Sequence, residues 1–171
     1  TAGVSTFVPK PHTPFQWEGQ VEREELRRRQ LLVHERLKGK RLEHRWHEPE
    51  QSFLEAVFSK GDRRTAAALE RAWRLGCRLD GWSEHFRFDL WQQAFQETGL
   101  DPTFYANRKP AAGETLPWDH LDPGVSKEFL LQERERALSG ERTPDCSRER
   151  CSACGVCPAL DIPIRRRGET K

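Results

Sequence analysis

Apolar residues recur at helical spacing along most of the chain, and this pattern predicts a mainly helical protein. Between Gln20 and Leu37, Leu26, Val33 and Leu37 fall on one stripe, with glutamates near the start and basic residues near the end. Both charge biases suit the helix dipole, and Gly39 is placed to end the helix. We therefore expect a helix over about 20–37 with one apolar face.

More helices are expected between residues 49 and 140, where prolines, glycines and capping residues separate the apolar stretches. The expected helices run from Pro49 to Gly61, from the cap Asp62 to Gly76, from Phe88 to Thr98, over one turn after Asp101 and Pro102, and from the cap Asp122 and Pro123 to about Gly140. In the second of these, Ala66, Leu69 and Trp73 share the face that we expect to be buried. The last should bury Phe129, Leu130 and Leu138.

Two short segments are typical of strands. The first is the apolar, β-branched run from Gly3 to Pro9, and the second carries Leu42, His44 and Trp46 between charged residues. A single strand is not stable without a partner sheet, and sequence upstream of Thr1 is the natural place for one. The chain also begins with Thr1 and contains no methionine. We therefore expect it to be a piece of a longer polypeptide.

Length and composition limit the class of protein. A chain of 171 residues makes roughly one domain, or a small domain with long appendages. Charged residues account for 33% and the mean hydropathy is -0.87, but six tryptophans and nine phenylalanines are too many for a disordered chain. The sequence has neither a long apolar run nor a signal peptide. We therefore expect a cytoplasmic protein without a membrane partner.

The net charge of +2 is unevenly distributed. Residues 22–45 carry nine basic and five acidic residues, residues 46–145 carry 13 and 18, and residues 146–171 carry six and three. This distribution excludes a uniformly basic surface for nucleic acid, while two local basic patches remain candidate phosphate contacts. A solvated helix face and a mobile tail explain the same charges and are the favoured interpretation.

Four cysteines within twelve residues are the strongest chemical signal. Cys146, Cys151, Cys154 and Cys157 have the spacing C-x4-C-x2-C-x2-C. Two-residue gaps let the backbone fold back so that both sulfurs reach one centre, and the small residues in the gaps permit the turn. Soft thiolates favour zinc or an iron–sulfur cluster. We therefore expect these four side chains to be metal ligands.

The spacing leaves the identity of the metal open. Three cysteines at two-residue gaps, the last followed by Pro158, resemble half of a ferredoxin site, although the bacterial run has three residues before its last cysteine. Structural zinc sites usually take their ligands from two separated knuckles. An iron–sulfur cluster is favoured over zinc, and thiols or disulfides without a metal are the third alternative. Cys77 stands apart, beside a helix end, and is expected to be a buried structural thiol.

A weaker candidate site contains Asp119, His120 and Asp122, whose side chains suit metal binding or proton transfer. Asp122 is already explained as a helix cap, however, and a surface turn is the favoured interpretation of the group. The sequence contains no P-loop, dinucleotide fingerprint, nucleophile elbow or HExxH motif, so the corresponding enzyme classes have no support.

Several sequence blocks resemble a radical S-adenosylmethionine (SAM) family. The block VSTFVPKPHTPFQW, which begins at Val4, resembles the end of a radical SAM barrel, as in methylthiotransferases. The later blocks are similar to the C-terminal part of the bacterial cobalamin-binding-domain radical SAM family; they are SFLEAVFSKGDRR from Ser52, LDGWSEHF from Leu79, LPWDH from Leu116, VSKEFL from Val125, and TPDC from Thr143 with the cysteines after it. Together the blocks extend from Val4 to Pro158, and their combination is specific.

The resemblance implies a fold and a division into three parts. Residues 1–45 would hold the last strand, Val4 to Val8, and the last helix of a radical SAM (β/α) barrel. Residues 46–145 would form an appended helical region, and residues 146–171 the four-cysteine metal site and a basic tail. The expected fold class is therefore mainly α with a few short strands.

The resemblance also implies cofactor-binding residues. Lys10, His12 and Thr13 lie at the expected mouth-side end of the barrel strand. Because parallel barrels place their sites at the C-terminal ends of the strands, these three side chains would face the cofactor or the substrate. The parent protein would use SAM, with cobalamin as a candidate second cofactor.

One departure from the family bears on activity. A radical SAM enzyme binds its catalytic cluster through cysteines at C-x3-C-x2-C, and the cysteine run of this chain does not match that motif. The motif, the cobalamin-binding domain and the rest of the barrel, which would be the main partner of this chain, are expected upstream of Thr1. This chain alone is therefore expected to be inactive.

The leading hypothesis is the C-terminal part of an enzyme that modifies an unidentified substrate by radical chemistry, with RNA and protein as the candidate substrates. The rival hypothesis is a non-catalytic binding module. In that case zinc orders the C-terminal region, and Arg165 to Arg167 contact nucleic-acid phosphates.

Overall fold

The structure is a computed structural model that describes residues 1–39 and 41–163. The described part is mainly helical, with seven helices and one two-stranded sheet, as the sequence predicts. Its contacts group the chain into two compact units. Unit 1 comprises Thr1–Lys10 and Glu18–Lys109, and unit 2 comprises Pro11–Trp17 and Pro110–Lys171. These two units cut across the predicted boundaries at residues 45 and 145. The division of the chain into three parts stays a prediction.

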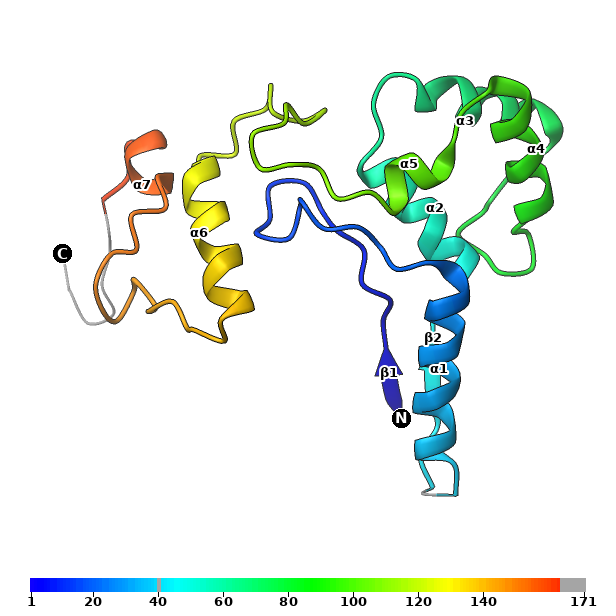
Figure 1. Cartoon of the computed structure of the whole chain (residues 1–171), viewed down its shortest axis with the longest axis horizontal. Coiled ribbons are helices and arrows are strands. Elements are labelled where there is room, and N and C mark those ends of the chain that lie inside the picture. Colours follow the sequence, from blue (N-terminus) through cyan, green and yellow to red (C-terminus); the bar gives the residue numbers. More distant parts are fainter. Residues whose placement is uncertain (40, 164–171) are drawn as a thin grey trace. The chain divides into compact units, whose positions relative to one another are not determined.

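Unit 1 begins with a strand–helix–strand arrangement. Strand β1 (Ala2–Val4) pairs in parallel with β2 (His44–Trp46), and helix α1 (Arg23–Leu37) connects them and lies alongside (Figure 1). The prediction of a strand reaching Pro9 is wrong in extent. The strand ends at Val4 because its partner, Trp46, is the last residue of β2, so the chain beyond Val4 has no backbone to pair with.

Helix α1 begins three residues later than expected and buries less of its apolar stripe. Gln20 does not enter the helix, because its side-chain amide donates to the Phe7 and Ser52 carbonyls and its backbone N–H donates to the Ala106 carbonyl. Within α1 only Leu26 is buried. The other apolar residues of α1 are half-buried or exposed; they are Leu31, Leu32, Val33 and Leu37.

Four helices form the core of unit 1: α2 (Pro49–Ser59), α3 (Thr65–Leu75), α4 (Phe88–Thr98) and α5 (Pro102–Ala106). The bounds of α4 and the helix ends at Gly76 and Gly99 agree with the sequence, since both glycines adopt a left-handed conformation. The buried apolar residues of this core are Phe53, Leu54, Ala56, Val57, Ala68, Ala72, Cys77, Trp91, Ala94, Phe95, Tyr105 and Ala106.

The predicted buried face of α3 is wrong. Leu69 and Trp73 are exposed, and the face that packs is formed by Thr65, Ala68 and Ala72. Helices α3 and α4 meet through alanines, Ala94 among them, and such small side chains allow close approach. The cap is also different: the Asp62 carboxylate accepts the Arg64 amide, but Asp62 lies outside the helix, which begins at Thr65.

Unit 2 is built around helix α6 (Lys127–Leu138). The short helix α7 (Val156–Ala159) follows later in the chain and is the last element described. The buried apolar residues of unit 2 are Trp17, Leu116, Trp118 and Leu130. The predicted cap Asp122 is wrong: Ser126 caps α6 by accepting the Phe129 amide at 3.2 Å, while Asp122 closes the preceding turn by accepting the Gly124 amide. Leu138 is exposed rather than buried.

Candidate functional site

The cysteine segment of unit 2 forms a tight turn at its centre. The Ala153 amide donates to Cys151 Sγ at 3.3 Å, and the backbone φ angles are 58° at Ala153 and 96° at Gly155. Cys154 and Cys157 are half-buried, whereas Cys151 is exposed. The backbone of this turn therefore directs an amide N–H at the Cys151 sulfur.

This turn is attached to the start of α6. The Ser126 amide donates to the Cys154 carbonyl at 3.0 Å. A Cβ atom on Gly155 would lie 3.1 Å from the Gly124 carbonyl oxygen, so both the close approach and the positive φ favour glycine at this position. The backbone of the cysteine segment is thus joined to the turn that caps the main helix of unit 2.

The four predicted ligands are not gathered into one site. Within residues 1–39 and 41–163, no three side chains of Cys, His, Asp and Glu lie close enough together to hold a metal ion. Thiols have no mutual attraction that would bring them together, and at such sites metal binding and folding are coupled. The amide-to-sulfur hydrogen bond and the two left-handed residues shape the turn around Cys151, but they do not bring the four sulfurs together.

The fifth cysteine, Cys77, is buried in the core of unit 1, as predicted. Burial raises the pKa of its thiol, and the nearby carboxylates of Asp80 and Asp89 raise it further. Cys77 therefore stays protonated and unreactive near neutral pH.

The three predicted cofactor-binding residues fall in different units. Lys10 belongs to unit 1, where its ammonium group pairs with the Glu55 carboxylate. His12 and Thr13 belong to unit 2, where the Thr13 carbonyl accepts the Gln16 amide and closes a turn. His12 adopts φ of 55°, a conformation that few non-glycine residues take. The residues Arg165 to Arg167, which the binding-module hypothesis predicts to contact phosphates, lie outside the described residues.

His12 lines a polar cavity of about 360 Å³ in unit 2. The same cavity is lined by Asp119, His120 and Asp122, the weaker candidate group of the sequence, and by Lys127 at the start of α6. The structure therefore brings His12, a predicted cofactor-binding residue, together with the weaker candidate group, although more than a hundred positions separate them along the chain.

Sequence patterns gave no sign of the residue that joins these groups. Gln16 is 3% exposed, and its side-chain oxygen accepts the indole N–H of Trp118 at 2.6 Å and the backbone N–H of His12 at 3.0 Å. A lone glutamine beside a tryptophan in a proline-rich segment matches no motif. Only its burial shows that it connects the N-terminal segment of unit 2 to the segment around Trp118.

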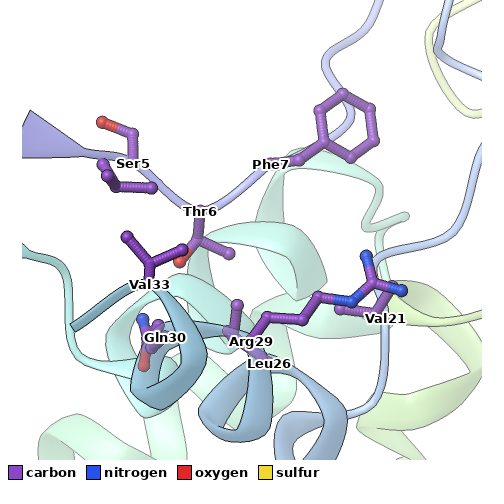
Figure 2. A pocket seen from close by; sticks show the side chains of 9 residues that line it. Ser5, Thr6, Phe7, Val21, Leu26, Arg29, Gln30 and Val33 are labelled. Atoms are coloured by element: carbon purple, nitrogen blue, oxygen red, sulfur yellow. The ribbon is translucent and has the colours of Figure 1, made fainter. Parts of the chain in front are cut away.

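A second cavity, of about 230 Å³, lies in unit 1 between α1 and the chain that follows β1. It is mainly apolar, and Figure 2 shows Thr6 facing the helix side chains Leu26 and Val33, whereas Phe7 points away from the helix. The buried Thr6 hydroxyl has no hydrogen-bond partner in the described part of the chain. This side of unit 1 is therefore incompletely covered.

Searches of protein-family models, curated proteins and solved structures yield no match to this chain. In the described residues, no helix combines the length and the apolar character needed to cross a membrane.

Proposed function

We propose that this chain is the C-terminal portion of a radical SAM enzyme that modifies RNA or protein, with a metal centre held by Cys146, Cys151, Cys154 and Cys157. The resemblance of the sequence blocks is the reason for proposing this family. The observation that carries the proposal is the arrangement of β1, α1 and β2, because a parallel strand–helix–strand unit is the repeating element of a (β/α) barrel. In that barrel β2 would be one strand beyond the strand that the sequence predicts to be the last.

The uncovered apolar surface of unit 1 supports a larger barrel. A sheet of two three-residue strands is too small to be stable alone, and parallel sheets occur almost only with both faces covered. Yet Val4, which lines the apolar cavity of Figure 2, is 41% exposed, and Leu31 on α1 is 61% exposed. Further parallel strands and their helices would cover these side chains and pair with the strand edges.

The roles of the cofactors differ. The cysteine spacing of this chain does not fit the C-x3-C-x2-C motif of a SAM-cleaving cluster, so no step of SAM cleavage is assigned to its residues. When bound, a four-cysteine centre supplies a structural crosslink if it is zinc, or electron transfer if it is an iron–sulfur cluster. Lys10, His12 and Thr13 remain candidate contacts for SAM or cobalamin in the parent protein.

The metal centre is tested by purifying this chain without oxygen, then recording its visible absorption and measuring iron, sulfide and zinc. We expect iron with sulfide, lost when Cys146, Cys151, Cys154 and Cys157 are all replaced by serine. The matched control is Cys77→Ser, which removes a buried thiol from unit 1 and should leave the metal content unchanged. Metal content that is the same in the four-serine variant would overturn the ligand assignment.

Zinc in place of iron supports the binding module instead, if zinc-loaded protein also binds RNA in a salt-sensitive way.

The enzyme assignment has its own test. The polypeptide that contains this chain together with any sequence before Thr1 should carry C-x3-C-x2-C and, when reduced, release 5′-deoxyadenosine from SAM. A start codon directly before Thr1, or no such release, contradicts the assignment.

A further inference from the structure

Two histidine side chains line the polar cavity of unit 2. His12 reaches the cavity from the N-terminal segment of unit 2 and His120 from the loop before α6. Neither imidazole has a hydrogen bond to any other residue that the structure describes. Their ring nitrogens are therefore available to a molecule that enters the cavity.

The carboxylates of the cavity are already engaged. Lys127 Nζ lies 2.8 Å from Asp119 Oδ2, which also accepts the Leu116 amide at 2.9 Å. Burial opposes ionisation of Asp119, but Lys127, the Leu116 amide and the nearby His12 together lower its pKa. Asp119 is thus a carboxylate neutralised by Lys127, and the Asp122 carboxylate accepts the Gly124 amide at 2.8 Å.

The charge of the lining depends on the two imidazoles. Lys127 contributes one positive charge, and Asp119 and Asp122 contribute two negative charges. With both imidazoles neutral the lining is therefore negative by one charge, and with both protonated it is positive by one.

We propose that this cavity binds a small organic oxyanion, with its carboxylate or phosphate between His12 and His120 and its apolar part against the apolar lining residues. Those residues are Leu121, Pro123, Val125 and Leu130. The cavity, of about 360 Å³, has room for a ligand of this kind. The proposal concerns residues of unit 2 and does not need the metal centre; it shares only His12 with the candidate cofactor contacts of the proposed function.

Hydrogen bonds support the residues around the cavity. The buried Gln16 side chain holds the His12 backbone and the Trp118 indole, so His12 and the loop that carries His120 share one support. Lys127 Nζ also donates to the Glu114 carbonyl at 3.1 Å, which fixes the ammonium group at the cavity edge. A site held in advance loses less entropy on binding.

The test uses benzoate and phenyl phosphate as anionic probes and benzyl alcohol as a neutral match. Binding is followed through the NMR signals of the Trp118 indole and the histidine rings at pH 8 and pH 6. Because protonated imidazoles attract the anion, we expect both anions to bind about 3- to 10-fold more tightly at pH 6. The tighter of the two anions identifies the head group, and benzyl alcohol should bind more weakly than either.

The variants are His12→Asn and His120→Gln, alone and combined. Asparagine tolerates the left-handed backbone of His12 better than most residues, so this variant is expected to fold. The double variant should lose the gain in affinity at low pH, while His85→Gln, at an exposed position in unit 1, should behave like the native chain. Equal affinity at the two pH values, equal binding of benzyl alcohol, or an unchanged double variant would overturn the proposal.

Discussion

Among the described residues of unit 1, Lys60 is the most deeply buried charged residue, at 5% exposure. Its ammonium group donates to the Glu18 carbonyl at 2.7 Å and to the Arg108 carbonyl at 2.8 Å. It therefore joins the segment that leads into α1 to the segment that follows α5. Hydrogen bonds from a charged donor to buried carbonyls are among the stronger ones in proteins.

Lys60→Met keeps most of the side-chain volume but removes both hydrogen bonds. We expect it to lower the free energy of unfolding by about 3 kcal/mol, measured by urea titration, because two carbonyls lose their charged donor. The control is Lys109→Met, whose ammonium group is exposed and pairs with Glu18 Oε2 at 2.9 Å. Its expected loss is below about 1 kcal/mol. Equal losses of unfolding free energy in the two variants would show that the buried hydrogen bonds of Lys60 stabilise the fold no more than an exposed ion pair does.

Asp62 makes unit 1 sensitive to acid. The Arg64 side chain donates to its carboxylate and lowers its pKa to about 2, despite the opposing effect of burial, and the Tyr105 hydroxyl donates to Oδ1 at 3.1 Å. The pKa is lower in the folded than in the unfolded chain. This stabilisation is therefore present above about pH 4 and is lost as the pH falls toward 2.

Asp62→Asn should accordingly be less stable than the native chain at pH 7, by about 1 kcal/mol after allowance for partial exposure of the carboxylate. Between pH 5 and pH 2 its stability should also fall less than that of the native chain, as followed by thermal unfolding across the pH range. Glu84→Gln, at an exposed carboxylate with no hydrogen-bond partner among the described residues, is the control. A native-like acid profile of Asp62→Asn would contradict this role.

At the scale of elements, the approach to α1 packs against the end of α5. The Gln20 amide donates to the Ala106 carbonyl at 2.8 Å, and the Asn107 side chain donates back to the Gln20 carbonyl at 2.9 Å. Between these bonds, a Cβ atom on Gly19 would lie 1.9 Å from the Asn107 carbonyl oxygen. The two segments approach this closely only because residue 19 has no side chain.

Gly19→Ala should therefore force the two segments apart and lower the free energy of unfolding by about 3 kcal/mol or more. Circular dichroism during denaturant titration measures this loss. At Gly81 a Cβ atom would meet nothing within 4 Å, so Gly81→Ala is the matched control and should stay within about 1 kcal/mol of the native chain. Similar stability of the two variants would contradict the close approach at Gly19.

At the scale of the whole molecule, the chain has two cores that share no residue. One lies among α2, α3, α4 and α5 in unit 1, and the other lies beneath α6 in unit 2. Because the contacts within each unit form their own network, loss of packing in one core should weaken that unit first.

Leu130→Ala removes a buried side chain from unit 2, and Val57→Ala removes one from unit 1. We expect losses of about 3 kcal/mol and about 2 kcal/mol, respectively. Hydrogen exchange read by mass spectrometry should show Leu130→Ala lowering protection in α6 and leaving α4 unchanged, with the reverse for Val57→Ala. Equal loss of protection in both helices, in either variant, would mean that the two units unfold together.

Sequence determined the helices wherever local signals agreed with one another. Helix α4 has the predicted bounds because an apolar stripe, Phe88, Trp91 and Phe95, is followed by Gly99 in a left-handed conformation. The short helix α5 follows from Asp101, which accepts the Thr103 amide as expected of a cap. Such signals act over three or four residues, so the sequence alone contains them.

The tertiary structure decided which faces and which distant residues meet. Local spacing cannot show that α3 packs through Ala68 and Ala72 rather than Leu69 and Trp73, because the choice depends on how closely α4 approaches. The same holds for the cavity of unit 2, where Gln16 holds His12 and Trp118 together although they are far apart in the sequence. Neighbouring residues determine caps and turns, whereas packing depends on surfaces that only the folded chain brings into contact.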